Sequence, residues 1–369
     1  MKKNSILKIN QPRDMFHLQW HVTERCNLRC SHCYMDENLI KDEMGLGTVK
    51  DILYQYLDLV REWRMPRSKN RISFTGGEPF VRSDLFDILE ECNKNHDMLQ
   101  YGLLSNGFFL SDENVSRLRS LRVDYVQVSI EGVEKNNDSI RGKGAFKKAV
   151  EGIKRVVDAG IGASISMTVH RKNLNDVAEM ISLARRLKVG VIGIRRLVPC
   201  GHGKGMRDLM LTPAETKEVM CYIARTALQT RDVYITCGCE DGIVSQNMHY
   251  SPIGCLAGFH SLTILPNGNV YPCRRLPVLA GRLKEESLKD IFCKSDLLNE
   301  IRNVNNNNTE CLVCPFFNEC LGGAKCISYA YWGKLGGGDP QCWRRFDKLP
   351  AADTRWAVPG KERKTTTYF

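Results

Sequence analysis

The sequence predicts an α/β fold: a partial (β/α)6 TIM-like barrel followed by a C-terminal loop-rich domain. Two observations lead to this prediction. Between residue 16 and about residue 228, six strand-like segments alternate with longer amphipathic segments, which is typical of a parallel sheet with helices on its outside. Beyond about residue 230, turn signals multiply, helix-like segments shorten and cysteines cluster. The pattern leaves open whether the barrel closes.

Each predicted strand is a short apolar run. The runs cover residues 16–22, 71–74, 101–104, 125–130, 163–169 and 191–197. The segments between them carry apolar side chains at helical spacing. They predict helices over residues 48–63, 84–94, 114–121, 145–160, 174–188 and 212–228. We expect the last helix to begin with Thr212 as its N-cap and Pro213 at its first helical position.

The change of pattern near residue 230 predicts a domain boundary. We expect a barrel domain over residues 1–230, a linking region over 231–254, a cysteine-rich domain over 255–345 and a basic tail over 346–369. The cysteine-rich part has too many loops to build a large core alone, so we expect bound metal to stabilise it. Within it, the stretch SLTILPNGNVYPC predicts a β-hairpin around Asn267 and Gly268.

Composition and charge narrow the class of protein. The chain has 369 residues, of which 43% are apolar and 26% charged, a normal balance for a globular protein. It has no apolar run of membrane-spanning or signal-peptide length, so we expect a cytoplasmic protein without a membrane partner. The net charge is +11, and residues 61–71 hold five basic residues. This run is either a solvated helix end or a surface for an acidic partner; no zinc-finger, RRM or KH signature supports nucleic acid.

The sixteen cysteines indicate metal or redox sites. Disulfides are typical of exported proteins, and no signal peptide is present here. Nine of the sixteen lie between Cys237 and Cys326, several at short, ligand-like spacings. Cysteines that only fill a core would be scattered along the chain.

Three cysteines stand at C-x3-C-x2-C spacing directly after the first predicted strand. They are Cys26, Cys30 and Cys33, and they lie where such barrels carry their chemistry, at the carboxyl end of a strand. Structural zinc prefers four ligands, and the adjacent His32 is an awkward fourth. A [4Fe–4S] cluster bound by three cysteines keeps one iron open for a substrate or cosubstrate. Three thiolates therefore favour a reactive cluster.

The stretch CNLRCSHCY, in which Tyr34 follows the last cysteine, resembles the signature loop of the radical S-adenosylmethionine (SAM) family. The resemblance implies that the open iron chelates SAM. It also implies that an electron from the cluster cleaves SAM to methionine and a 5′-deoxyadenosyl radical, which abstracts hydrogen from the substrate. A zinc knuckle is the alternative for these three cysteines.

Further parts of the family pattern recur in order at the ends of later strands. The GGEP stretch after the second strand is similar to the family segment that holds the SAM amino group, and we expect the charge of Glu78 to pair with it. Glu131 stands where many relatives have Asp. The stretch MTVHRKN (167–173) ends the fifth strand. By this resemblance the SAM-binding residues are Gly76, Gly77, Glu78, Pro79, Ser105, Asn106, Ser129 and Arg141.

The C-terminal cysteines resemble the SPASM extension, which binds two auxiliary Fe–S clusters in a subgroup of radical SAM enzymes. The resemblance predicts a helix over residues 280–292 after the hairpin. It assigns Cys255, Cys273 and Cys326 to the first auxiliary cluster, and Cys311, Cys314, Cys320 and Cys342 to the second. With the SAM cluster this gives three [4Fe–4S] clusters. A pair of zinc sites is the alternative.

Two features depart from the SPASM pattern. Five residues separate Cys320 from Cys326, where the family has three. The fourth ligand of the first auxiliary cluster is also not evident, because Ser261 falls where some relatives place a further cysteine. Cys237, Cys239 and an open iron that binds substrate are the alternatives.

The resemblance predicts a radical SAM oxidoreductase that modifies a ribosomally made peptide or protein, by crosslinking or by side-chain oxidation. The alternative substrate is a tetrapyrrole, as in heme or heme d1 synthesis. A non-enzymatic Fe–S scaffold or electron carrier would explain the cysteines but not Gly76, Gly77 and Glu78. We expect a flavodoxin or ferredoxin as electron donor. Since only 25 residues precede Cys26, we also expect any leader-peptide-binding domain to come from another chain.

Overall fold

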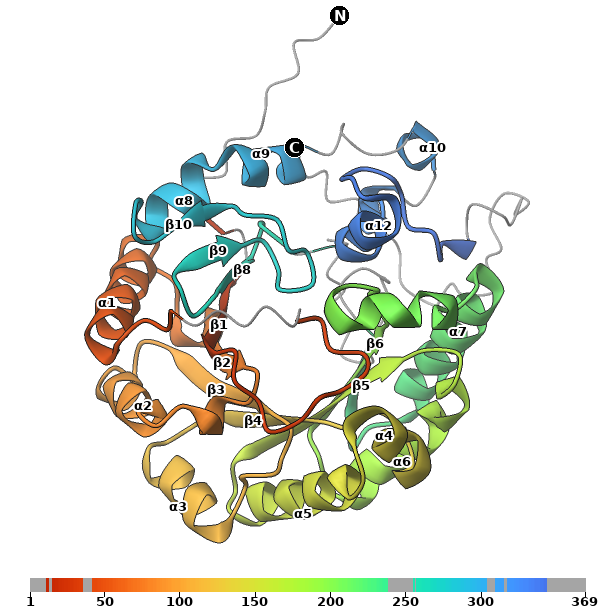
Figure 1. Ribbon diagram of the computed structural model, residues 1–369, viewed down its shortest axis with the longest axis horizontal. Coiled ribbons are helices and arrows are strands. Elements are labelled where there is room, and N and C mark those ends of the chain that lie inside the picture. The colour runs from red at the N-terminus through yellow and green to blue at the C-terminus, as the bar shows by residue number, and fades with distance from the viewer. Residues whose placement is uncertain are drawn as a thin grey trace, which may run out of the picture.

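The computed structural model describes residues 11–12, 15–35, 42–237, 255, 257–303, 309–314 and 317–343. Its centre is one ten-stranded sheet with the order β10-β9-β8-β1-β2-β3-β4-β5-β6-β7. All neighbours from β8 to β7 are parallel, whereas β9 and β10 pair antiparallel. The sheet curves into an incomplete barrel with helices around its outside (Figure 1). The predicted partial barrel is confirmed.

The six predicted strands are present with small shifts at their ends. They are β1 (Phe16–Thr23), β2 (Asn70–Gly76), β3 (Gln100–Ser105), β4 (Tyr125–Ser129), β5 (Gly162–Val169) and β6 (Val191–Arg196). A seventh parallel strand, β7 (Tyr234–Thr236), pairs with β6 and was not predicted. It has three residues and lies inside the expected linking region, so it is too short to show a pattern of its own.

The predicted helices cover the outer face of the sheet. They are α1 (Leu46–Glu62), α2 (Leu85–Lys94), α3 (Asp112–Ser120), α5 (Ala145–Asp158), α6 (Val177–Arg186) and α7 (Pro213–Gln229). The predicted start of α7 is confirmed: Thr212 Oγ1 accepts from the Glu215 amide at 3.2 Å, and Glu215 Oε2 accepts from the Thr212 amide at 2.7 Å. This capping box satisfies amides that the first helical turn leaves without a partner. The short helix α4 (Glu134–Arg141) was not predicted.

Side chains alternate along the strands between the helices and the barrel interior. In β1, Phe16, Leu18 and Trp20 are fully buried under the helices, while His17 and Gln19 line an interior cavity. The other strands repeat this two-residue period. Branched apolar side chains normally fill a TIM barrel. Here the interior positions are mostly polar or small: Ser73, Thr75, Gln127, Ser164, Ser166, Thr168, Gly193 and Thr263 all line the cavity. The interior therefore stays open.

The C-terminal region begins by extending the barrel sheet. Strand β8 (Ser261–Ile264) pairs in parallel with β1, and β9 (Asn269–Tyr271) pairs antiparallel with β8, which confirms the predicted hairpin. Gly268 adopts a φ of +86° in the turn and donates to the Leu265 carbonyl at 2.9 Å. Leu262, Ile264 and Val270 belong to the same apolar core as the barrel.

The helix predicted over 280–292 is wrong in its first half. Residues Gly281–Arg282 form β10, which pairs with β9, and α8 (Leu288–Lys294) begins only after Ser287. The Ser287 hydroxyl accepts from the Asp290 amide at 3.0 Å, so it caps a helix that starts there. The remaining helices are α9 (Asp296–Arg302), α10 (Thr309–Leu312), α11 (Phe317–Cys320) and α12 (Lys325–Trp332).

A second, smaller apolar cluster connects the cysteine-rich part to the end of the barrel. It joins Leu197 and Val198 after β6 to Leu276 and to Ile327 of α12. The buried ion pair between Arg196 and Asp339, at 2.7 Å, adds a polar connection. The proposed domain limits stay a prediction, and residues 238–254 and 344–369 lie outside the described residues. Within the described residues, no helix is both long and apolar enough to span a membrane.

Candidate active site at the carboxyl ends of the strands

A cavity of about 1520 Å³ occupies the barrel interior. Pockets for single small ligands usually measure about 300–1,000 Å³, so this one has room for a cofactor and part of a substrate. Cys26, Cys30 and Cys33 all line it. Six of the eight predicted SAM-binding residues line it too: Gly76, Gly77, Ser105, Asn106, Ser129 and Arg141. Glu78 and Pro79 are buried and do not appear in its wall.

The loop with the three cysteines follows β1 and is held from several sides. The Cys33 amide donates to the Cys30 carbonyl at 3.1 Å, which forms a tight turn between two of the thiols. After β6, the amides of His202 and Gly203 donate to the carbonyls of Met35 and Cys33 at 3.1 and 3.0 Å. The loop is therefore fixed at its far end by the segment that follows another strand.

The sulfur atoms suit an iron–sulfur cluster. Three soft thiols share one cavity wall, and nitrogen donors approach two of them: Arg141 Nη1 lies 3.9 Å from the Cys30 sulfur, and Asn106 Nδ2 lies 3.9 Å from the Cys26 sulfur. Burial raises the pKa of both thiols, in the case of Cys30 to about 11. Bound iron would favour the thiolate forms. Within the described ranges, no three Cys, His, Asp or Glu side chains converge on a position for one metal ion.

The two glycines of the GGEP stretch lie against the strand that leads into the cysteine loop. A β-carbon on Gly76 would come 2.0 Å from the Thr23 carbonyl oxygen, and one on Gly77 would come 2.2 Å from that of Arg25. The Gly77 and Glu78 amides donate to these same two carbonyls, each at 2.9 Å. Gly76 and Gly77 were predicted to bind SAM. In the structure, the space beside these two glycines is occupied by the backbone of residues 23–25, so the start of the cysteine loop packs directly against the end of β2.

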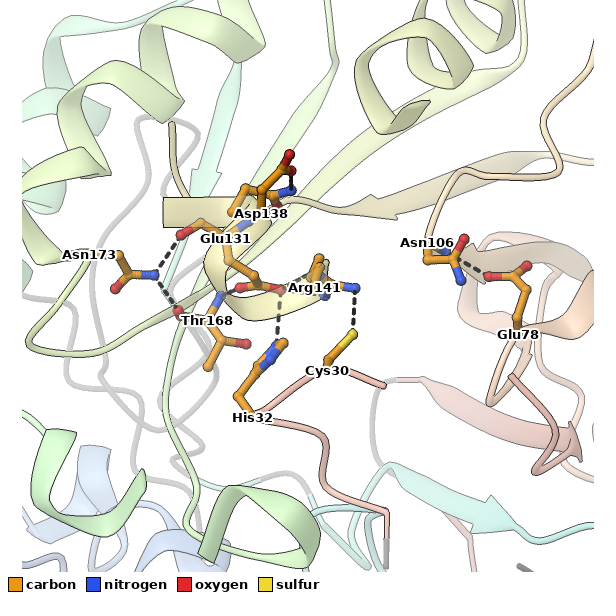
Figure 2. A network of polar contacts seen from close by, with 10 residues as sticks. Cys30, His32, Glu78, Asn106, Glu131, Asp138, Arg141, Thr168 and Asn173 are labelled. Atoms are coloured by element: carbon orange, nitrogen blue, oxygen red, sulfur yellow. Dashed lines mark hydrogen bonds and ion pairs between the residues drawn. The ribbon is translucent and has the colours of Figure 1, made fainter. Parts of the chain in front are cut away.

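Glu78 connects the ends of two neighbouring strands. Its side chain is fully buried, and one oxygen accepts from the Ser105 hydroxyl at 2.9 Å. The other oxygen accepts from the Asn106 amide at 2.8 Å (Figure 2). Burial raises the Glu78 pKa to about 7, although these donors oppose the shift. Asn106 in turn donates to Asn27 Oδ1 at 2.8 Å, beside Cys26. Pairing of Glu78 with the SAM ammonium remains a prediction.

A network that the sequence analysis did not identify centres on Glu131. This buried carboxylate accepts from His32 Nε2 at 3.1 Å, from the Arg141 guanidinium and from the Thr168 amide at 2.5 Å (Figure 2). Asn173 fixes the backbone around it by donating to the Glu131 and Thr168 carbonyls at 2.6 and 3.0 Å. Burial alone would raise the Glu131 pKa, but Arg141 and then His32 hold it well below its usual range.

This network connects the ends of β4 and β5 to the cysteine loop. His32 stands between Cys30 and Cys33, and Arg141 reaches from Glu131 to the Cys30 sulfur. His32 thus binds a carboxylate and positions the loop, where the sequence analysis considered it only as a metal ligand. The signal that could have revealed the network is the spacing of two opposite charges around α4: Glu131 lies three residues before the helix, and Arg141 is its last residue.

The C-terminal region also reaches the cavity. Arg274 donates to Glu24 Oε1 at 3.3 Å, and its guanidinium lies 5.5 Å from the centre of the Tyr34 ring. The preceding residue, Cys273, lines the same cavity as the three-cysteine loop. A predicted auxiliary ligand and the predicted SAM cluster therefore share one cavity.

The structure brings some of the predicted auxiliary ligands together. Cys273 and Cys326 pack in the second apolar cluster, whereas Cys237 lies in the barrel core at the end of β7. Cys311 and Cys314 are joined by a turn in which the Cys314 amide donates to the Cys311 carbonyl at 3.1 Å. The other predicted auxiliary ligands are half-buried: Cys255, Cys320 and Cys342. Cys239 lies outside the described residues, and the ligand assignments stay predictions.

Comparison with known proteins identifies both parts of the chain. The family model of the radical SAM superfamily matches residues 20–184, and that of an iron–sulfur cluster-binding domain, SPASM, matches residues 255–315. The AdoMet-dependent heme synthase of Methanosarcina barkeri is 26% identical over 349 residues, covering 90% of this chain and 97% of that protein. The mycofactocin maturase MftC of Mycolicibacterium smegmatis is 28% identical over 341 residues, covering 88% of this chain and 82% of that protein.

The fold is also similar to solved structures. Streptococcus suis SuiB bound to its precursor peptide SuiA superimposes with a TM-score of 0.70 at 17% identity, over 91% of this chain and 76% of SuiB. The three-cysteine loop and the glycine stretch beside it lie in the first matched region, and Cys255, Cys273, Cys311 and Cys314 lie in the second. The protein is an enzyme of the radical SAM superfamily, in the subgroup with a SPASM iron–sulfur domain.

Proposed function

We propose that the enzyme holds a [4Fe–4S] cluster on Cys26, Cys30 and Cys33 and cleaves SAM reductively to modify a ribosomally made peptide or protein. The single observation that carries the proposal is that these three thiols line one large cavity together with six of the eight predicted SAM-binding residues. When bound, cluster and SAM supply one-electron chemistry that ends in abstraction of a hydrogen atom from the substrate.

The residues of the chain position these groups. The three thiolates bind iron, and the Glu131, Arg141 and His32 network keeps their loop in one conformation. The close packing of Gly76 and Gly77 aligns the end of β2 with the same loop. Ser105, Asn106 and Ser129 supply polar groups at the cavity wall for SAM. The surrounding barrel limits the access of water to the reacting atoms.

The elongated cavity supports a peptide substrate. Its lining runs from Arg71 and Tyr125, near the amino ends of their strands, to the cysteine loop at the carboxyl ends. In β1 these two levels are six residues apart, roughly 20 Å, so an extended peptide of about six residues would span them. The similarity to a maturase agrees with this substrate class. We further propose that the SPASM region holds two auxiliary clusters and that a flavodoxin or ferredoxin donates the electrons.

A second candidate function is the modification of a tetrapyrrole. The similarity to the Methanosarcina barkeri protein, named a heme synthase, extends over 97% of that protein and favours this alternative. The two functions differ in the size and shape of the substrate that must enter the same cavity.

One experiment tests the proposal and separates the two substrate classes. Anaerobically reconstituted enzyme is incubated with SAM, dithionite and either synthetic peptides encoded by neighbouring short reading frames or iron-containing tetrapyrrole precursors. Formation of 5′-deoxyadenosine together with a mass change in one substrate class assigns the function. A protein that reconstitutes with iron but forms no 5′-deoxyadenosine would contradict it.

A further inference from the structure

Two arginines line the barrel interior outside the Glu131 network: one lies near the amino end of its strand, and the other lies near the carboxyl end of its strand but folds its side chain back. Arg71 belongs to β2 and Arg195 to β6, and both line the cavity. Arg71 pairs in register with His17 of β1, six residues before Thr23 at the carboxyl end of that strand. At about 3.3 Å per residue, this places the layer of Arg71 roughly 20 Å along the strand from the cysteine loop.

No carboxylate neutralises these two arginines among the described residues. The cavity wall contains three acidic side chains, and each already has a basic partner: Glu24 pairs with Arg274, Asp124 with Arg67, and Glu131 with Arg141. Arg71 donates to Gln100 Oε1 at 3.2 Å, and its buried Nε has no hydrogen-bond partner. Within the part of the chain that the structure describes, Arg195 forms neither an ion pair nor a hydrogen bond.

The surrounding residues hold this layer in a defined arrangement. His17 Nε2 lies 2.7 Å from the Ser73 hydroxyl, which lies 2.6 Å from the Tyr125 hydroxyl. The Arg71 guanidinium lies 5.0 Å from the centre of the Tyr125 ring. The Tyr125 ring lies over Gly102 of the neighbouring strand β3. This position must be glycine, because a β-carbon there would come 2.7 Å from the ring.

The Arg195 side chain lies over Gly193 of the same strand. A β-carbon on Gly193 would come 3.4 Å from Arg195 Nη2, because the side chain folds back along its own strand over that position. The guanidinium is therefore directed toward the amino end of β6, away from the cysteine loop. Burial, then Arg71 and then Arg195, lower the His17 pKa to about 4, which indicates that both cations act near this histidine. At neutral pH His17 is therefore uncharged, with one ring nitrogen that can donate a hydrogen bond and one that can accept.

We propose that Arg71 and Arg195, with His17 beside them, form a subsite that binds a carboxylate or phosphate group of the substrate. The proposal rests on the proposed function and deepens it, because it adds that the substrate is anionic at the end remote from the reacting atom. Two guanidinium groups without an acidic partner in a partly enclosed site favour an oxyanion, which each can bind through paired N–H donors. The subsite would orient the substrate along the barrel.

Anion binding to the reconstituted holoenzyme tests the subsite directly. Succinate and inorganic phosphate are titrated separately, in a buffer without other oxyanions, into wild-type enzyme and into Arg71→Gln, Arg195→Gln and the double variant. Calorimetry gives the dissociation constants. We expect one of the two anions to bind the wild type, and each single variant to weaken that binding about tenfold or more, since a charge-assisted contact is lost. The preferred anion identifies the group as carboxylate or phosphate.

Two further variants make the result specific. Arg119→Gln removes the same charge from the exposed face of α3 and should leave anion binding unchanged. Arg195→Lys keeps the charge and should bind the anion more tightly than Arg195→Gln, which keeps the test informative if the uncharged variant folds poorly. Equal anion binding by the wild type and the double variant, or no anion binding by a wild type that binds SAM, would overturn the subsite alone. A wild type that fails to bind SAM would overturn the proposed function instead.

Discussion

The barrel and the last cysteine-rich segment, residues 309–343, differ in how their elements are supported. Strands β1 to β6 are five to eight residues long and pack against helices in one continuous apolar core. In the last segment, α10 and α11 have four residues each, and the apolar cluster beneath α12 is small. Five of the predicted auxiliary ligands belong to this segment: Cys311, Cys314, Cys320, Cys326 and Cys342.

The difference suggests a division of roles. Burial of apolar side chains is enough to form the barrel, whereas helices of four residues are not stable without further constraints. Ligand bonds to iron would supply such constraints, since metal binding and folding are coupled in small metal-binding regions. Cleavage of SAM should then require only the barrel and its cluster, whereas formation of the modified product should require the cysteine-rich segment as well. The predictions below test this division from the largest expected effect to the smallest.

The largest effect is expected at the three-cysteine loop. Replacing Cys26, Cys30 or Cys33 with Ala leaves two protein ligands for the cluster, and formation of 5′-deoxyadenosine should stop. Iron should fall from about 12 to about 8 atoms per chain, because two auxiliary clusters of four irons remain. Iron analysis and a dithionite assay check both numbers, with Cys221→Ala on α7 as the control. Continued 5′-deoxyadenosine formation in the triple variant would show that the reactive cluster lies elsewhere.

Auxiliary ligands should affect the product more than SAM cleavage. In Cys311→Ala or Cys342→Ala, modified substrate should no longer form, because the electron released from the substrate has no acceptor. 5′-Deoxyadenosine should still appear. Mass spectrometry of the substrate and chromatography of the nucleoside measure both, and Cys293→Ala on α8 is the matched control. Loss of 5′-deoxyadenosine in a folded variant would mean that the division of roles is incorrect.

A smaller, graded effect is expected from Glu78→Gln. The amide has one uncharged acceptor oxygen, so one of the two donors, the Ser105 hydroxyl or the Asn106 amide, loses its acceptor and the other keeps only a neutral one. A loss of about 1.5–3 kcal/mol in this contact should weaken SAM binding about tenfold to a hundredfold, while iron content stays unchanged. Calorimetry with SAM measures it, and Glu113→Gln on the exposed start of α3 is the control. Unaltered SAM affinity would show that this connection does not position the SAM site.

The smallest effect concerns the stability of the barrel without its clusters. Glu91 on α2 bonds to Tyr54 of α1 at 2.5 Å and to Lys94 at 2.9 Å, and these contacts lower its pKa from 4.5 to about 2. A carboxylate with a lowered pKa stabilises the fold above its ordinary pKa, and this contribution disappears as the pH falls from about 4.5 to 2. Glu91→Gln should therefore reduce the free energy of unfolding at pH 7 by about 1–2 kcal/mol.

Chemical denaturation of cluster-free protein between pH 7 and pH 3 measures this dependence. The difference between the variant and the wild type should shrink as the solution becomes more acidic, and Glu90→Gln, exposed on the same helix, should cause little change. A difference that stays constant with pH would indicate a packing effect rather than a charge effect. If the cluster-free barrel shows no cooperative unfolding, its stability also depends on iron.

Much of the barrel was predictable because its signals are local. Apolar runs and helical periodicity predicted β1 to β6 and six helices, and the Thr212 cap follows from neighbouring residues. The elements that were missed or misplaced depend on distant partners. Strand β7 exists because β6 offers it an edge, and residues Gly281–Arg282 form a strand because β9 lies beside them. The secondary-structure propensities of residues within each segment carry no information about these partner strands.

The sequence by itself determined the chemistry of the site: three thiols at a fixed spacing after a strand, the glycine stretch, and polar residues at later strand ends. Ligand type and spacing are properties of the chain, so no coordinates are needed to recognise them. Only the tertiary structure decided what surrounds these residues. Glu131 contacts His32, which is 99 residues away in the sequence, and Gly77 packs against Arg25, which is 52 residues away. Arg71 and Arg195 line one cavity although 124 residues separate them in the sequence. Such contacts form when strands align side by side in the sheet. The alignment brings residues together however far apart they lie in the sequence.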